Sequence, residues 1–170
     1  MSSAKMREIK IEKVTLNIGT GEPGAKLDKA MKLLNSISGM KPVATKTKKR
    51  IPGWKIRPGL EIGCRVTMRK QLAKDVLKRL LTSINNKIES KRFDTNGNFS
   101  FGVKEYLEIP GVKYDPDIGI IGLEAAVTLQ RPGFRIPRRR IKKRKIHPKH
   151  LITKEEAMEF IKKEFNAEVI

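Results

Sequence analysis

Apolar and polar residues alternate along three segments of the chain, and this alternation restricts the possible fold more than any other feature. In residues 62–69 every second residue is apolar, and the residues between them include Arg65 and Thr67. Residues 14–18 and 121–129 show the same alternation. Because successive side chains of a strand point to opposite faces, each segment predicts a strand with one buried and one polar face. A parallel sheet covered on both faces would instead have continuously apolar strands.

Segments with a helical spacing of apolar residues lie between and after these strands. Their apolar residues recur three and four positions apart, which is the period of one helix face. The last of these segments opens with a capping box, in which Thr153 is followed by Glu156. We expect helices at 27–37, 72–84 and 153–165, and further short strands at 42–47 and 99–103.

These elements predict an α+β fold, in which helices pack on one face of a mainly antiparallel sheet and leave the other face free. The 170 residues are enough for one domain, so we expect a single domain over 1–170 with a loose terminus at 1–6. No apolar run approaches the roughly 20 residues of a membrane span. No segment resembles a signal peptide, which predicts a protein that stays in the cell.

The net charge of +20 is concentrated in two segments. Residues 29–60 contain nine basic residues and no acid, residues 131–150 contain ten and no acid, and the rest of the chain is nearly neutral. Such concentrations of like charge repel one another unless a polyanion binds them, and the simplest polyanion is nucleic acid. An anionic membrane is the alternative, but neither segment forms an aromatic-rich amphipathic face.

The first basic segment contains an unusual loop at residues 48–60. The loop has no acid, two Pro-Gly pairs and the only tryptophan of the chain, Trp54. An exposed aromatic residue on a basic loop suits stacking on RNA bases. The alternative is that Trp54 anchors the loop to the core.

The second basic segment, the basic extension at 131–150, would be disordered on its own because its charges repel one another. Its length and arginine content favour a segment that threads along folded RNA, although a nuclear-import signal has a similar pattern. The residues expected to contact RNA are Arg135, Arg138, Arg139, Arg140, Lys142, Lys143, Arg144 and Lys145.

The polar faces of two predicted strands carry hydrogen-bond donors. If both strands face the same helical layer, these donors share one surface that suits phosphate and 2′-hydroxyl contacts. The alternative is an ordinary solvated sheet face. The donors are Lys13, Thr15 and Asn17 on one strand, and Arg65, Thr67 and Arg69 on the other.

Other chemistry has weak support in the sequence. The glycine turn at 19–24 has the form G-x-G-x-x-G, but Glu22 stands where a pyrophosphate would sit and no acidic ribose ligand follows. Cys64 is in phase with apolar residues, which indicates a core residue. His147 and His150 have no further cysteine or carboxylate cluster beside them. We therefore expect no metal, no cofactor and no enzyme activity; a nucleotide-dependent enzyme is the alternative.

Six blocks of residues carry a resemblance to a known family. They are Lys13-Val-Thr-Leu-Asn-Ile-Gly-Thr-Gly-Glu22, Lys41-Pro-Val-x-Thr-Lys-x-Lys-Lys49, Gly53-x-x-Ile-Arg-x-Gly59, Ile62-Gly-Cys-Arg-Val-Thr-Met-Arg69, Phe93-Asp-x-x-Gly-Asn-Phe-Ser-Phe-Gly-Val-Lys-Glu105 and Pro110-Gly-Val-Lys-Tyr-Asp-Pro-x-Ile-Gly119. In order and spacing these blocks resemble the L-five family of large-subunit ribosomal proteins. The resemblance covers nearly the whole chain from about Met6, and the basic extension with its following helix resembles the archaeal and eukaryotic branch.

The resemblance implies an α+β structural protein of the large ribosomal subunit in the cytoplasm. Members of the family bind 5S rRNA and help hold it in the central protuberance, among large-subunit rRNA and other central-protuberance proteins. They also contact the P-site tRNA and bridge to the "S-thirteen" protein of the small-subunit head. The resemblance places this bridge near residues 112–118 and implies no membrane partner.

The resemblance also assigns residues. The expected 5S rRNA surface combines family positions with the strand-phase argument and comprises Lys13, Thr15, Asn17, Gly19, Gly21, Arg65, Thr67 and Arg69. The expected tRNA-facing loop comprises Arg50, Gly53, Trp54, Lys55, Ile56 and Arg57. The family often has phenylalanine where this chain has Trp54, so the capacity for stacking is retained. The extension has no bacterial counterpart, and ribosomal RNA is its expected partner.

Overall fold

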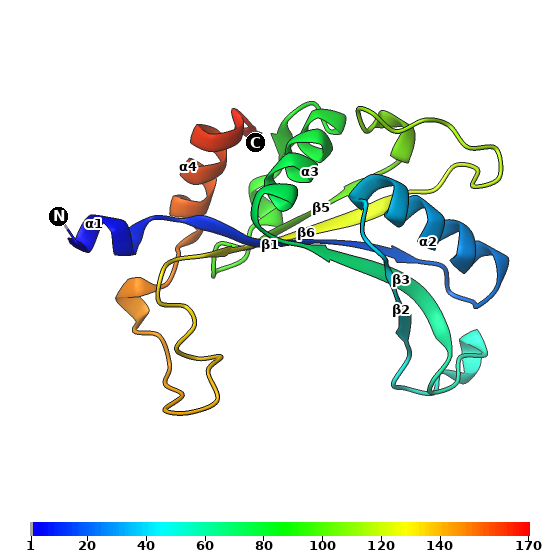
Figure 1. The fold of residues 1–170 in the computed structure, drawn as a ribbon, viewed down its shortest axis with the longest axis horizontal. Helices are drawn as coiled ribbons and strands as arrows, with labels where there is room; N and C mark the ends of the chain where they lie inside the picture. Colours follow the sequence, from blue (N-terminus) through cyan, green and yellow to red (C-terminus); the bar gives the residue numbers. More distant parts are fainter. Residues whose placement is uncertain (1) are drawn as a thin grey trace.

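A five-stranded antiparallel sheet forms the centre of the computed structural model, which describes residues 2–170, with side chains from residue 5 onward (Figure 1). The strands lie in the order β2-β3-β1-β6-β5, and each neighbouring pair is antiparallel. These strands are β1 (Lys10–Gly19), β2 (Val43–Lys46), β3 (Glu61–Met68), β5 (Phe99–Val103) and β6 (Leu123–Gln130). The expected α+β class with a mainly antiparallel sheet is therefore confirmed.

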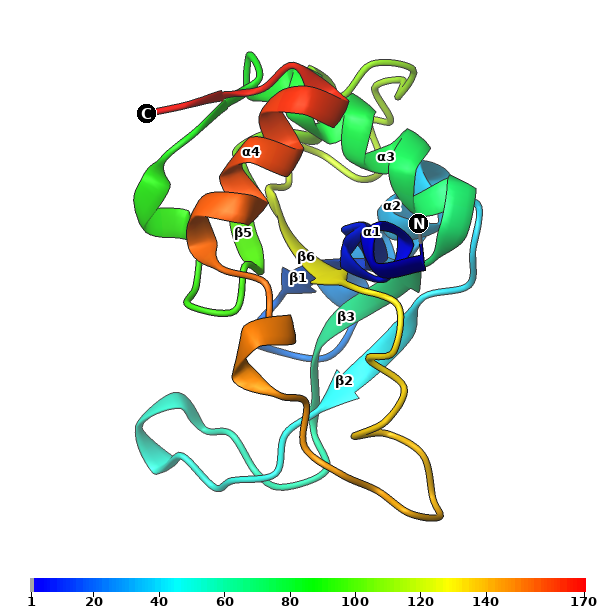
Figure 2. The same cartoon turned by 90° about the vertical axis from the view of Figure 1, so that its left-hand side faces the viewer.

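Helices cover one face of this sheet (Figures 1 and 2). Helix α2 packs on β3, helix α3 packs on β1, and α4 lies beside α3, where Lys74 Nζ is 2.7 Å from Glu164 Oε1. No helix among the described residues is long and apolar enough to cross a membrane. The helices are α1 (Ser2–Arg7), α2 (Ala25–Ser38), α3 (Lys70–Ser83) and α4 (Lys154–Phe165).

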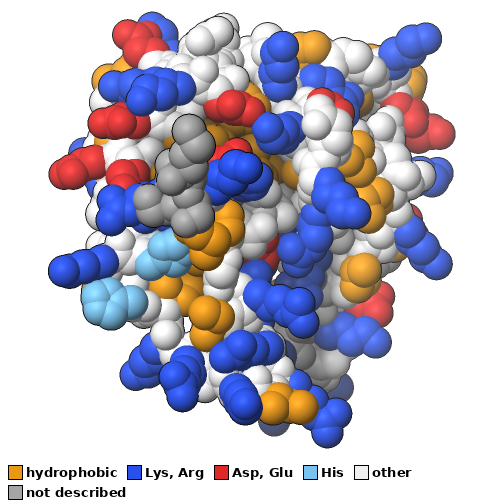
Figure 3. Space-filling view, turned by 60° about the vertical axis from the view of Figure 1, so that its left-hand side comes forward, with side chains coloured by type: hydrophobic (Ala, Val, Ile, Leu, Met, Phe, Trp, Pro, Cys, Tyr) orange, Lys and Arg blue, Asp and Glu red, His pale blue; other side chains and the backbone are white. Residues whose placement is uncertain are grey.

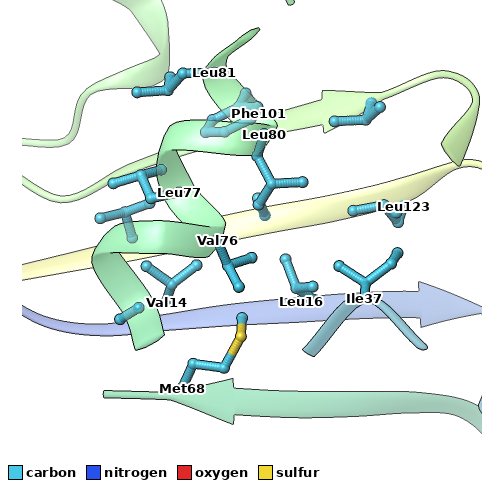
Figure 4. Close-up of a cluster of buried hydrophobic side chains, with 14 of the residues drawn as sticks. Val14, Leu16, Ile37, Met68, Val76, Leu77, Leu80, Leu81, Phe101 and Leu123 are labelled. Carbon is cyan, nitrogen blue, oxygen red and sulfur yellow. The ribbon is translucent and has the colours of Figure 1, made fainter. Parts of the chain in front are cut away.

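The core fills the space between the helices and the sheet (Figure 4). Val14 and Leu16 of β1 and Met68 of β3 point toward Val76 and Leu80 of α3, and all five are fully buried. These are the apolar positions of the alternating and helical patterns, so the periodicity of the sequence selects the covered face. The polar positions between them therefore lie on the other face.

Small elements complete the fold. Residues 2–7 form the short helix α1, which overlaps the segment 1–6 that we expected to be a loose terminus, and Met1 lies outside the described residues. A two-stranded parallel sheet and four 3-10 turns also escaped the sequence analysis, since two or three residues carry no readable period. These are β4 (Lys87–Ile88), β7 (Glu168–Val169), η1 (Pro52–Trp54), η2 (Ser90–Arg92), η3 (Tyr106–Glu108) and η4 (Pro148–His150).

Cys64 is a core residue, as its phase on β3 predicts. Its side chain is fully buried, and burial raises the pKa of the Cys64 thiol to about 11, so it is no nucleophile near neutral pH.

Replacing Cys64 by Ser puts a hydroxyl into this apolar site, and we expect about 1–3 kcal/mol lower stability in urea denaturation. Cys64→Ala is the matched control without a polar group. A Ser variant as stable as the wild type would contradict the core assignment.

Candidate nucleic-acid interface

The uncovered face of the sheet brings the predicted donors of β1 and β3 together. Thr15 lies opposite Thr67, with their Oγ1 atoms 3.3 Å apart, and Asn17 lies opposite Arg65. We call the surface of Lys13, Thr15, Asn17, Arg65, Thr67 and Arg69 the polar sheet face. Each of its side chains is partly or fully exposed. The prediction that the two strands share one polar surface is confirmed.

The same surface continues across β6 and β5 as a shallow hollow of about 690 Å³. Small residues such as Ser100, Gly102 and Ala126 form its floor, and Arg92 and Lys104 stand among its lining residues. Asn17 Nδ2 donates a hydrogen bond of 3.4 Å to Glu124 Oε2 within this hollow. The sequence analysis missed this half of the surface. The alternation of small residues with phenylalanines along 99–103 could have predicted it, because this pattern places the small residues on the uncovered face.

The glycine turn after β1 closes onto β3 rather than around a ligand. The amides of Thr20 and Gly21 both donate to the carbonyl of Ile62, at 2.9 and 3.0 Å. A pyrophosphate cradle needs such amides free, so this arrangement disfavours the dinucleotide alternative. Gly63 has to be glycine because a Cβ there would lie 2.7 Å from the carbonyl oxygen of Ile18. Gly63 therefore permits close pairing of β1 and β3 at this end of the sheet.

The loop at 48–60 is an ordered extension of the β2–β3 hairpin. Backbone hydrogen bonds of 2.9 Å join Thr47 to Leu60 and to Gly59, and a pair of 3.0 and 3.1 Å joins Ile51 and Ile56 near the tip. The side chain of Trp54 is 73% exposed, which rules out its role as an anchor to the core. Among the predicted contact residues of this loop, only Ile56 is buried.

Ile56 is 7% exposed and stabilises the loop from within, although we expected it at the contact surface. The backbone bridge to Ile51 turns the Ile56 side chain inward. The exposed residues of the tip are Arg50, Gly53, Trp54, Lys55 and Arg57.

The basic extension is attached to the rest of the fold at its base. Arg131 at its start is 4% exposed, and its Nη2 lies 2.6 Å from Glu156 Oε1 at the start of α4. Arg131 Nη1 donates to the carbonyls of His150 and Leu151, at 3.4 and 3.1 Å. One buried arginine therefore closes the base of the extension, and this internal partner removes part of the repulsion that predicted disorder.

His150 also closes the base of the extension, whereas His147 makes only a local contact in a turn. His150 Nε2 lies 2.9 Å from the carbonyl of Pro132, and the ring packs edge-on against Phe134 with centroids 5.7 Å apart. His147 Nδ1 accepts a hydrogen bond from the amide of Lys149. Within residues 2–170, no group of three histidine, cysteine or acidic residues is placed to hold a metal ion.

A second clip attaches the middle of the extension to β1. Glu12, with a side chain only 3% exposed, accepts hydrogen bonds from both terminal nitrogens of Arg138, the one to Oε2 measuring 2.6 Å, and from Arg69 Nη1 at 3.2 Å. Burial acts to raise the pKa of Glu12, but the hydrogen bonds from Arg138 and Arg69 outweigh it and hold the pKa below its usual range. Glu12 is therefore a charged carboxylate at neutral pH.

The sequence analysis missed Glu12, although a signal was present. Glu12 falls in phase with Val14 and Leu16, and an acid among apolar positions needs a buried partner. A β-bulge places Glu12 as an extra residue between Ile11, opposite Leu129, and Lys13, opposite Thr128. The bulge lets Ile11 enter the core while Glu12 reaches the two arginines.

The other basic residues of the extension face solvent. Figure 3 shows the side of the molecule that bears the extension, and Lys and Arg side chains crowd its lower part. Within residues 2–170, no ion pair connects a carboxylate to any of Arg135, Arg139, Arg140, Lys142, Lys143, Arg144 and Lys145. The extension and the 48–60 loop both project from the uncovered side of the sheet (Figures 1 and 2). This side therefore combines polar donors with two cationic projections.

Glu156→Gln tests the clip at Arg131. Glutamine still completes the capping box with Thr153, so the substitution removes the carboxylate but leaves the helix cap. We expect the free energy of unfolding at pH 7 to fall by about 1–2 kcal/mol, less than for a fully buried pair because Glu156 is partly exposed. Glu159→Gln, on the exposed side of α4, is the matched control. Equal stability of the two variants in urea denaturation would contradict the role of the clip.

Acid should weaken the same clip. Burial acts to raise the pKa of Glu156, but hydrogen bonds from the Thr153 backbone and from Arg131 outweigh it, so the pKa lies below its ordinary value of 4.5. A carboxylate with a lowered folded-state pKa stabilises the protein above the unfolded-state pKa, and this contribution is lost as the pH falls through the folded-state value. The unfolding free energy should therefore decline below about pH 4.5, and less steeply in Glu156→Gln. Parallel pH profiles would refute this linkage.

Comparison with known proteins places the chain beside one group of ribosomal proteins. A family model described as "Ribosomal protein L5" matches residues 4–57, and the model of the C-terminus of the same ribosomal family matches residues 61–164. The protein named "Large ribosomal subunit protein uL5" of Nanoarchaeum equitans is 52% identical over 97% of this chain and 98% of its own length. Proteins of the same name from Sulfurisphaera tokodaii and Methanosphaera stadtmanae are 47% and 45% identical, over 97% and 94% of this chain and 94% and 95% of their own lengths.

Proposed function

The chain belongs to the ribosomal protein L5 family and is an archaeal-type protein of the large ribosomal subunit, and from this premise we propose that its polar sheet face binds 5S rRNA in the central protuberance. Its function is structural: it holds RNA in place. The matched family regions and the uncovered sheet together support this proposal. The observation that carries it is the register of Thr15 with Thr67 and of Asn17 with Arg65.

The chemistry of this face suits RNA. Threonine hydroxyls and the asparagine amide both donate and accept hydrogen bonds, so they fit phosphate oxygens and 2′-hydroxyl groups. Arg65 and Arg69 add positive charge at the exposed side of β3. Affinity then arises from counterion release along the cationic projections, and orientation arises from the polar sheet face.

We propose that the 48–60 loop contacts the P-site tRNA. Its hairpin hydrogen bonds support a defined shape of the loop, and its tip presents the exposed indole of Trp54 next to Lys55 and three residues before Arg57. An exposed aromatic ring flanked by cations can stack on a base or ribose while the cations contact phosphates. Such a contact suits a ligand that is exchanged in each elongation cycle.

We propose that the surface near residues 112–118 contacts the "S-thirteen" protein of the small-subunit head. The neighbouring Glu105, Glu108, Asp115 and Asp117 make this surface acidic in an otherwise basic protein. Tyr114 is 58% exposed there. An exposed aromatic ring among carboxylates fits a basic protein partner better than RNA, which the acids would repel.

We also propose that residues 1–170 act as one domain. The two matched family regions share a single sheet, in which β1 from the first region lies between β3 and β6 from the second. The two strands of the first region, β1 and β2, pair only with strands of the second region. This interleaving supports one folding unit.

Binding of purified 5S rRNA tests the polar sheet face. We expect Asn17→Ala and Thr67→Ala each to weaken binding about 3- to 10-fold, which corresponds to the loss of one net hydrogen bond. Thr82→Ala on the helical side, whose hydroxyl bonds only within its own helix, is the matched control. Wild-type binding should also weaken steeply with salt. Sheet-face variants that bind like the Thr82→Ala control would overturn the proposal.

The loop has a separate test. Trp54→Ala should leave 5S rRNA binding within about twofold of the wild type, because the ring lies outside the polar sheet face. In ribosomes that contain the variant, chemical protection of P-site tRNA next to this protein should be reduced. Tyr114→Ala, also an exposed aromatic, is the control and should leave that protection unchanged. A large loss of 5S rRNA binding in Trp54→Ala would contradict the division of roles.

A further inference from the structure

Glu12 connects two parts of the cationic side that the sequence treats as separate. It lies 3.2 Å from Arg69, which belongs to the polar sheet face, and it accepts two hydrogen bonds from Arg138 of the basic extension. Residues 12, 69 and 138 come from three distant parts of the chain. The extension leaves the end of β6 and turns toward the uncovered side of the sheet (Figure 1).

The arrangement leaves both arginines able to bind a ligand. Their side chains are 56% and 53% exposed, whereas the side chain of Glu12 is only 3% exposed. The carboxylate therefore fixes the guanidinium groups from below and is itself shielded from an RNA on the surface. A guanidinium has five donors, so hydrogen bonds to Glu12 leave others for phosphate oxygens.

We propose that Glu12 is a positioning residue that joins the polar sheet face and the basic extension into one RNA-binding surface, occupied by a single RNA. This inference rests on the proposed function and deepens it, because it assigns the extension to the 5S rRNA rather than to a separate ribosomal RNA. The unpaired cations beyond Arg138, including Arg140, Lys143 and Arg144, are held beside the sheet before RNA arrives. Preorganisation of this kind lowers the entropy lost on binding.

Charge and position predict opposite effects for Glu12→Gln. The substitution removes a negative charge from an RNA-binding surface, which by charge alone would strengthen binding. If Glu12 acts by position, its loss frees Arg69 and Arg138, and binding weakens. We expect about 5- to 10-fold weaker binding of purified 5S rRNA. Glu8→Gln is the control of equal charge change, because Glu8 is exposed and pairs only with Lys10 among the described residues; it should bind equally or slightly more tightly.

The free protein supplies a second readout. Limited trypsin digestion without RNA should cut faster within residues 135–145 of Glu12→Gln than of the wild type, with cutting elsewhere unchanged. Glu12→Asp keeps the charge but has a shorter side chain, so it tests position alone if the glutamine variant folds poorly. Weaker 5S rRNA binding by Glu12→Asp supports the proposal. Binding by either folded variant that equals or exceeds that of the wild type overturns it.

Neutralising the extension tests whether one RNA covers both parts. Arg140, Lys143 and Arg144, all exposed and without ion pairs in the described chain, are replaced together by alanine. The matched control replaces Lys78 of α3 and Lys162 and Lys163 of α4, exposed on the helical side and outside both basic segments, which removes the same charge. With 5S rRNA as the only RNA, we expect at least a tenfold loss for the extension variant and a salt slope that is lower by about 2–3, since three phosphate contacts are lost. Equal losses in both variants would refute the single surface. In that case the proposed function would still stand as long as the wild type binds 5S rRNA. If the wild type does not bind 5S rRNA, the proposed function fails, and this inference fails with it.

Discussion

One-sided burial of the antiparallel sheet is the constraint on which the rest of the structure depends. Val14, Leu16 and Met68 bury their side chains under α3, and the strand period then forces Thr15, Asn17 and Thr67 to the opposite face. A shift of one residue in register would exchange these two sets, so packing of the core also positions the polar surface. The apolar face thus determines where the proposed RNA-binding surface lies.

Three ion pairs on two carboxylates, each with one buried partner, adapt a highly charged chain to this architecture. Arg131 with Glu156 closes the base of the extension, and Glu12 attaches Arg138 and Arg69 to each other. The two carboxylates, Glu12 and Glu156, lie outside the two acid-free segments. Each of them binds an arginine of the segment 131–150. The charge that remains on the extension is then concentrated on the uncovered side of the sheet (Figure 3). Two acidic residues, Glu12 and Glu156, therefore connect the strongly basic extension to the folded domain.

The sequence predicted features that depend on period and missed those that depend on distant partners. The alternation in 62–69 predicted β3, its buried Cys64 and its polar face, because a strand imposes a period of two. The attachments of the extension were missed because Glu12 and Glu156 are remote in sequence from the arginines that they bind. Ile56 was misplaced for a similar reason, since only the bridge to Ile51 turns it inward. The family was identified from the resemblance of the six sequence blocks. The sequence predicted that β1 and β3 share a polar face, but it did not predict which of their residues lie opposite each other.

Lysine footprinting of the free and RNA-bound protein is the most direct test of this account. Lysines react with an acylating reagent with or without 5S rRNA, and mass spectrometry measures the protection of each. Lys13 on the polar sheet face and Lys143 on the extension should both be protected by the RNA. Lys78 on α3 and Lys162 on α4, on the covered side, should react equally in both states. Protection of the two helical lysines with continued reaction of Lys13 would contradict the account.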